Sequence, residues 1–184
     1  MGLVDAGRSV DADWAETAGC LISTLPFQVD LSARPSLRGL LTQLRAQTLE
    51  MRRHAHVELT EVRRWSGRHG AAPLFDTVVM YARRTLSEAL EARGCGWTNL
   101  QLVEEGDALV TLSVHGGAQL RIELEHDAAR LAEDEAGRML GHVTRLLTVM
   151  GAADADAPVA GLDMLSAAET EALLALGRPR DAGA

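Results

Sequence analysis

The chain has 184 residues, enough for one domain with an apolar core. Hydrophobic residues make up 47% and charged residues 24%, which is typical of a globular protein and argues against a disordered chain. The net charge of −8 and the aromatic content of 3% argue against nucleic-acid binding. Every one of the 18 basic residues is Arg, which excludes chemistry that depends on a lysine.

The chain carries no sign of export or of membrane insertion. No basic region followed by an apolar stretch is present, and the apolar runs are a few residues long. Cys20 and Cys95 belong to no CxxC or Cys/His cluster, and we interpret them as buried thiols in a reducing compartment. We therefore expect a cytoplasmic protein with no metal site and no membrane or nucleic-acid partner.

The first half of the chain predicts strands and two helices. Residues 1–18 are polar and rich in Gly and Asp, which is typical of a lead-in segment. Residues 20–29 favour an edge strand because Pro26 interrupts them. Apolar residues at helical spacing, including Leu41 and Leu49, predict a helix over 36–54, and a short helix follows over 59–65 and stops at Gly67.

The second half predicts most of a sheet and two further helices. The expected strands cover 73–82, 100–104, 108–115 and 119–126, with glycines at two tight hairpins, and residues 83–96 form a short helix or a long excursion. A long helix over 131–150 and a last helix to Leu176, opened by a Ser166–Glu169 capping box, complete the pattern. This order predicts one α/β domain in which helices flank a mixed β-sheet.

Residue chemistry alone assigns no catalytic residue. Histidine is the most common catalytic base, but His54 and His56 are two residues apart, whereas a helical metal pair needs a spacing of four. His126 and Asp127 lie between a strand and a helix, where they present a base or cap the helix, and both interpretations stay open. The chain contains no nucleophile elbow, phosphate-binding glycine loop or zinc motif.

Several segments in succession carry a resemblance to a known family. They read GCLISTLPFQV at 19–29, HAHVEL at 54–59, RRWSG at 63–67, LFDTVV at 74–79 and LDMLSAAE at 162–169. In order and spacing they resemble the C-terminal lobe of a condensation domain of nonribosomal peptide synthetases. The resemblance implies a chloramphenicol-acetyltransferase-like half-domain over 19–151 and a linker and short helix over 152–177, as at a condensation–adenylation junction. From the sequence itself, we interpret residues 178–184 as a disordered tail.

The resemblance also implies a function. Such domains take their catalytic histidine from an HHxxxDG motif in an N-terminal lobe, and this chain does not contain that motif. It implies the acceptor-side wall of an amide-forming site that is inactive alone, with substrates on the phosphopantetheine of a carrier protein and no bound cofactor. Ser23, Thr24 and Asp76 then line the substrate channel, and Ser23 stands where the family commonly has Asn.

Two other functions remain open. In one, the chain is a non-catalytic module that docks an acidic carrier protein through Arg38, Arg45, Arg52 and Arg53 of the 36–54 helix, although an ordinary solvated face explains the same arginines. In the other, it is an unrelated small acyltransferase that uses His126. The partners expected are a carrier protein, a complementary N-terminal lobe, or a second copy of the chain.

Overall fold

The computed structural model describes residues 1–5, 22–67, 73–83, 86–91, 93–94, 96, 106–117 and 119–177. Its strands form one mixed sheet in the order β2-β1-β3-β4-β5, which confirms the predicted α/β class. Neighbouring strands are parallel within the central trio of β1, β3 and β4, whereas the edge strands β2 and β5 are antiparallel. The strands are β1 (Gly2–Asp5), β2 (Ser23–Pro26), β3 (Thr77–Ala82), β4 (Val110–His115) and β5 (Arg121–His126).

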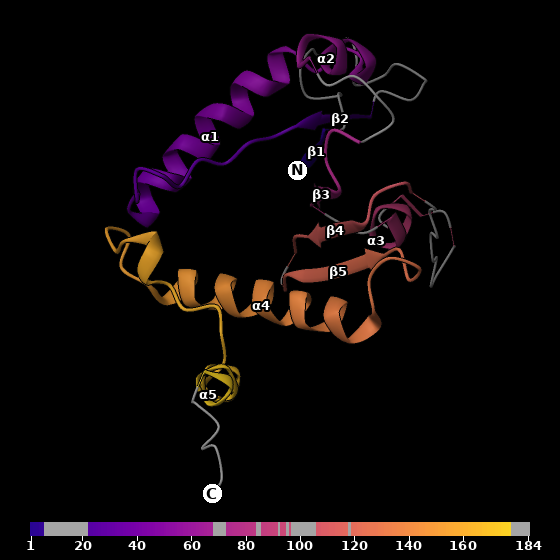
Figure 1. Cartoon of the computed structure of the whole chain (residues 1–184). Helices are drawn as coiled ribbons and strands as arrows, with labels where there is room; N and C mark the ends of the chain where they lie inside the picture. The colour runs from indigo at the N-terminus through magenta and orange to yellow at the C-terminus, as the bar shows by residue number, and fades with distance from the viewer. Residues whose placement is uncertain are drawn as a thin grey trace, which may run out of the picture.

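The two long helices lie against the same face of the sheet. The described helices are α1 (Leu37–Arg53), α2 (Leu59–Trp65), α3 (Leu86–Glu91), α4 (Glu133–Ala152) and α5 (Ala167–Leu176). Register places Asp5 and His126 on one face, where Asp5 contacts Arg52 of α1 and His126 contacts Glu133 of α4. From their meeting point α1 and α4 diverge along the sheet, like the arms of a V (Figure 1).

A short set of backbone bonds closes the V at its apex. The amides of Leu37 and Arg38 donate to the carbonyls of Ala157 and Ala155 at 2.9 and 2.7 Å, and Val159 donates back to the carbonyl of Pro35 at 3.0 Å. The first amides of a helix have no partner within the helix, so these carbonyls satisfy them. Ser36 completes the helix start, because its hydroxyl accepts from the amide of Gly39 at 3.2 Å.

The structure differs from the sequence expectations at the N-terminus. Residues 2–5, within the expected lead-in, form β1, which pairs with β2 on one side and β3 on the other. Gly2 fits because an added Cβ would stand 2.5 Å from the ring of Phe75. The expected strand at 100–104, both cysteines and the 178–184 tail lie outside the described residues.

The helix predictions agree well with the structure. Helix α2 has the predicted bounds, and Gly67 beyond it has a φ of 67°, a conformation that suits glycine. Glu133, Asp134 and Glu135 occupy the first turn of α4, where acidic side chains suit the positive end of the helix dipole. The expected strand over 119–126 is β5, in which charged Arg121, Glu123 and Glu125 alternate with apolar residues on the helix-facing side.

The hydrophobic core is small, and many apolar side chains outside it are exposed to solvent. Among the described residues, six apolar side chains are buried, namely Leu25, Phe27, Leu37, Leu40, Val110 and Ala136. Large apolar side chains are open to solvent on several elements, including Leu41 and Leu49 on α1, Tyr81 on β3 and Leu147 on α4. Surfaces of this kind are typical of an interface that another polypeptide covers.

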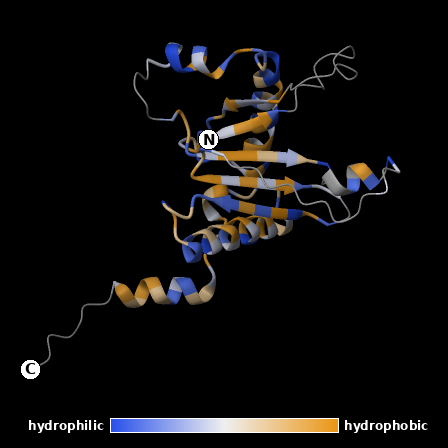
Figure 2. Ribbon diagram, turned by 90° about the vertical axis from the view of Figure 1, so that its right-hand side faces the viewer, coloured by the Kyte–Doolittle hydropathy of each residue, from blue (hydrophilic) through white to orange (hydrophobic). Residues whose placement is uncertain are grey.

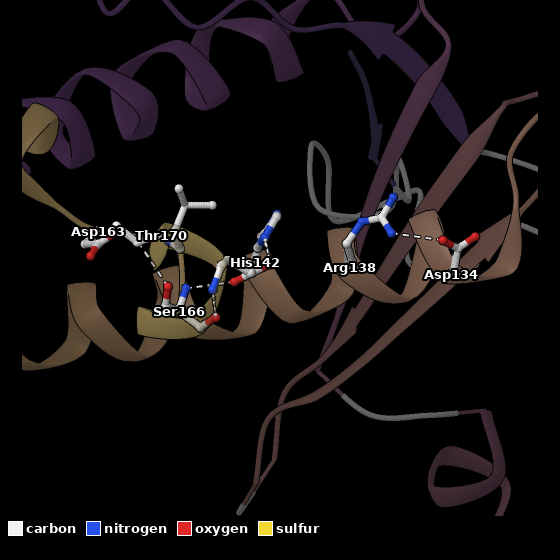
Figure 3. A network of polar contacts seen from close by, with 8 residues as sticks. Asp134, Arg138, His142, Asp163, Ser166 and Thr170 are labelled. Carbon is white, nitrogen blue, oxygen red and sulfur yellow. Dashed lines mark hydrogen bonds and ion pairs between the residues drawn. The ribbon is translucent and has the colours of Figure 1, made fainter. Parts of the chain in front are cut away.

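Helix α5 stands away from the body (Figures 1 and 2). Its leucines, coloured orange in Figure 2, are exposed, at 55% for Leu173 and 81% for Leu176. Figure 3 shows its attachment: His142 of α4 lies 2.7 Å from Glu169, whose other oxygen accepts from the Ser166 amide at 2.7 Å. The predicted capping box is therefore present, and one histidine joins it to α4. Within the described residues, no helix is both long and apolar enough to cross a membrane.

The attachment of α5 predicts a response to acid. Hydrogen bonds from Ser166, with a further contribution from His142, lower the pKa of Glu169 from 4.5 to about 2. A lowered pKa means that Glu169 supports α5 fully above its unfolded value, and that this support is lost as pH falls from about 4.5 towards 2. We expect Cα chemical shifts of residues 167–176 to lose helical character over that range.

Three variants test the origin of that response. S166A removes the cap and should destabilise α5 by about 1 kcal/mol. The helicity of α5 should therefore be lower in S166A at neutral pH. E171Q, at an exposed glutamate of the same helix, should leave the acid response unchanged. An acid response that survives in E169Q would contradict the assignment.

The packing of Gly2 predicts opposite effects for two Gly-to-Ala changes. G2A forces a Cβ into the ring of Phe75 and should lower the free energy of unfolding by about 1–3 kcal/mol. G137A in α4 meets nothing within 4 Å and should raise it by roughly 0.5–1 kcal/mol. Urea unfolding measures both, and equal effects would show that β1 is not packed against Phe75.

Candidate functional site

The three predicted channel residues occupy two separate places. Ser23 begins β2 directly opposite Asp5 of β1, and its buried hydroxyl has no hydrogen-bond partner among the residues that the structure describes. Thr24 is next in the strand, so its side chain points to the opposite face. Asp76 immediately precedes β3, is 56% exposed and lies 3.7 Å from Arg130.

The register shows that Ser23 and Asp76 are at opposite ends of the sheet. Pro26 and Val78 both pair with Gly2, which puts Ser23 level with Tyr81, three residues further along β3. Asp76 is five residues from Tyr81, or roughly 16 Å along the strand direction. The structure therefore does not bring the three channel candidates together, and a channel that touches all of them would have to run the length of the sheet.

The predicted docking arginines fall into groups with different surroundings. Arg38, Arg45 and Arg52 are spaced seven apart and share one stripe of α1, whereas Arg53 lies about 100° round the helix. Arg38 is paired with Asp156 at 3.0 Å and Arg53 with Glu50 at 2.9 Å, both in exposed positions. Arg45 is exposed and has no ion-pair partner among the described residues.

Arg52 differs from the other arginines because its partner is buried. Its Nε lies 3.3 Å from Oδ1 of Asp5, whose side chain is only 6% exposed. The second oxygen, Oδ2, is buried and has no hydrogen-bond partner within the described part of the chain. Arg52 therefore joins the end of α1 to the sheet, and less of it is available to a partner than its position on the helix suggests.

An open groove lies beside the other arginines of the stripe. It encloses about 370 Å³ near the apex of the V, between the start of α1 and the end of α4. Its walls carry apolar side chains of both helices, among them Leu41 and Met150, together with Arg38 and Arg45. With Leu49, which is 55% exposed, Arg38, Leu41 and Arg45 define a cationic and apolar surface that we call the docking face.

The histidines of the sheet do not form a catalytic arrangement. His126 is 11% exposed beneath the first turn of α4, with its Nε2 3.5 Å from Glu133. His115 is on the opposite face of the sheet, with its Nε2 3.4 Å from Glu123. Asp127 accepts from the amide of Ala129 at 2.9 Å, as the turn before α4 requires. These positions favour packing and turn roles over an acyltransferase base at His126.

Metal ligation finds no support in the part of the chain that the structure describes. Within it, no three His, Cys, Asp or Glu side chains come together as a group that could hold an ion.

The chain belongs to the condensation-domain family. The family model for the condensation domain matches residues 1–174, which includes β1 and extends the resemblance beyond the segments that carried it in the sequence. Condensation domains of nonribosomal peptide synthetases work on substrates held on the phosphopantetheine arms of carrier protein domains.

The curated relatives are large synthetases. The chain is 29% identical over 176 residues to chondramide synthase of Chondromyces crocatus, and 31% identical over 170 residues to the nonribosomal peptide synthetase fmqA of Aspergillus fumigatus. These matches cover 95% and 90% of the chain, but only 4% of each relative. The chain thus corresponds to a small part of enzymes of this kind.

Solved structures confirm the fold and show how much of a domain is present. The starter condensation domain of rhizomide synthetase, in a complex with C8-CoA, matches with a TM-score of 0.73 at 22% identity, covering 90% of this chain and 38% of the other. A four-domain nonribosomal peptide synthetase bound to AMP and glycine matches with a TM-score of 0.74 at 18% identity, covering 92% and 14%. The chain is therefore a partial condensation domain with the predicted chloramphenicol-acetyltransferase-like fold.

Asp5 is the site residue that sequence reasoning missed. It stands among small and apolar residues in a stretch interpreted as a lead-in, and its partner Arg52 is 47 positions away. In the sequence, Asp5 is noticeable only as an acidic residue beside apolar neighbours. That pattern does not indicate which basic residue pairs with it.

Proposed function

We propose that the chain forms the acceptor-side wall of an amide-forming site whose catalytic base is supplied by a complementary lobe with an HHxxxDG motif. The observation that carries this proposal is the extent of the match: nearly the whole chain aligns with about 38% of a condensation-domain chain. The exposed apolar side chains on α1, β3 and α4 support it, because a complementary lobe would cover such surfaces.

The proposed reaction joins two carrier-bound groups. The amine nitrogen of the acceptor attacks the carbonyl carbon of the donor thioester, a C–N bond forms, and the C–S bond breaks. The base on the other lobe takes a proton from the attacking amine and passes it to the donor's phosphopantetheine sulfur, which leaves as a thiol. This chain binds the acceptor and orients its amine towards the thioester. Holding two reactants in the right geometry accelerates their reaction even when the base comes from elsewhere.

Reconstitution with a complementary lobe tests this proposal. The chain and a separately produced HHxxxDG-bearing lobe from the native host are mixed with one donor-loaded and one acceptor-loaded carrier domain. We expect an amide product, detected by mass spectrometry, only when both lobes are present. Replacement of the second histidine of the motif by alanine is the matched control and should abolish it. Product formation by this chain alone, or none from the stable pair, would refute the proposal.

A second candidate is a docking module for carrier proteins that performs no chemistry. The docking face favours it: Arg45 has no ion-pair partner among the described residues and is exposed between Leu41 and Leu49, and carrier proteins are commonly acidic. The two proposals differ in whether a second lobe joins the complex.

A charge reversal tests the docking role. R45E should weaken binding of an acidic holo carrier domain by roughly tenfold and make the affinity less sensitive to salt, since an exposed charge pair is lost and a repulsion added. R63E places the same charge change on α2, away from the docking face, and serves as the matched control. Isothermal titration calorimetry at two salt concentrations measures both, and equal losses would refute the assignment of the face.

A further inference from the structure

The arginine stripe of α1 contains one residue that its surroundings set apart. Arg38, Arg45 and Arg52 occupy equivalent positions on successive pairs of turns. Within the described ion pairs, the partner carboxylates of Arg38 and Arg53 are 73% and 59% exposed, whereas that of Arg52 is 6% exposed. A pair with one buried member interacts in a less polar medium than a surface pair and is much more costly to break.

The pair lies at the C-terminal end of α1, where Met51 also lines a small pocket together with Leu25 and Pro26 of β2. Asp5 ends β1 and Arg52 is in the last turn of α1, so their contact spans from the sheet to the end of the helix. Further back, the side chain of Gln47 donates to the carbonyl of Gln28 at 2.7 Å. At its other end, the helix is held by the backbone bonds near residue 156. Arg52 therefore ties the last turn of α1 to the sheet, and the apex of the V holds the first turn.

We propose that Asp5 and Arg52 form an anchor that fixes the last turn of α1 on the sheet and so positions the docking face for a carrier protein. Arg52 is thus a positioning residue and is not part of the docking face itself. This inference rests on the docking role proposed above. It assigns to Asp5, which no carrier protein reaches, a measurable influence on carrier binding.

Removing the charge of Asp5 separates positioning from direct contact. If Arg52 touched the carrier, D5N would release it from a competing carboxylate and strengthen binding. If Arg52 anchors the helix, D5N loosens α1 and weakens binding by roughly threefold to thirtyfold. Asn has nearly the shape of Asp, so D5N keeps the packing around position 5 and removes only the ion pair.

E50Q is the matched control for D5N. It also removes one negative charge near the end of α1 and releases Arg53, together with the neighbouring His54, but Glu50 is 59% exposed and both contacts lie within the end of the helix. Any long-range effect of the lost charge is common to both variants, whereas the loss of the anchor occurs only in D5N. We expect E50Q to bind the carrier as tightly as the unmodified chain, or slightly more tightly.

The affinity measurement uses the holo carrier domains of the native host's nonribosomal peptide synthetases as probes. R52Q should lower the affinity and leave its dependence on salt unchanged, whereas R45Q should make that dependence shallower. Stronger binding by D5N, or a shallower salt dependence in R52Q, would overturn the inference. Thermal unfolding of each variant establishes that it is folded under the conditions of the assay.

Hydrogen exchange provides a readout that needs no carrier protein. Amides of residues 50–54 should exchange several-fold faster in D5N than in E50Q, and amides near the start of α1 should not change. Equal exchange in the two variants would overturn the anchor. If the unmodified chain binds none of the carrier domains, the docking role fails, and the exchange result alone then decides whether Asp5 holds the last turn of α1.

Discussion

The arrangement of the body depends on the backbone bonds at the apex of the V. The segment after α4 donates and accepts main-chain hydrogen bonds with Pro35, Leu37 and Arg38, as an added strand would. These bonds satisfy the first amides of α1 and tie residues about 120 positions apart in the chain. Since α1 follows one edge strand and α4 the other, this single junction closes the chain around the sheet and brings together the walls of the groove between the two helices.

The structure leaves apolar side chains exposed on α1, and the chain covers only about 38% of a condensation-domain chain. Leu37 and Leu40 face inward and are buried, whereas Leu41 and Leu49, on the next stripe of the same helix, are about half exposed. A helix with apolar residues on more than one stripe needs contacts on more than one side. The sheet supplies the first contact, and the proposed carrier or lobe would supply the second.

Local patterns predicted the helices well, because their signals lie within a few residues. The bounds of α2 and the Ser166–Glu169 capping box are set by neighbours in the chain. β1 escaped prediction because four residues carry no clear alternation, and the strand exists through pairing with β3, more than 70 positions away. The role of Arg52 was hidden for the same reason: helical spacing places it on a stripe with Arg45, but only the fold brings Asp5 to it.

The edges of the sheet limit how this chain can associate. β5 places Arg121, Glu123 and Glu125 along one side of its edge, and β2, at the other edge, is four residues long and ends in Pro26. Charges and proline at exposed strands oppose the addition of a further strand, which is the usual first step of strand-by-strand aggregation. Both edge strands of the sheet thus carry features that oppose pairing with another strand, although apolar side chains on its helices are exposed. A second polypeptide can still bind through the exposed apolar side chains of α1, β3 and α4. Binding of this kind requires a partner of complementary shape, and it does not lead to open-ended strand addition.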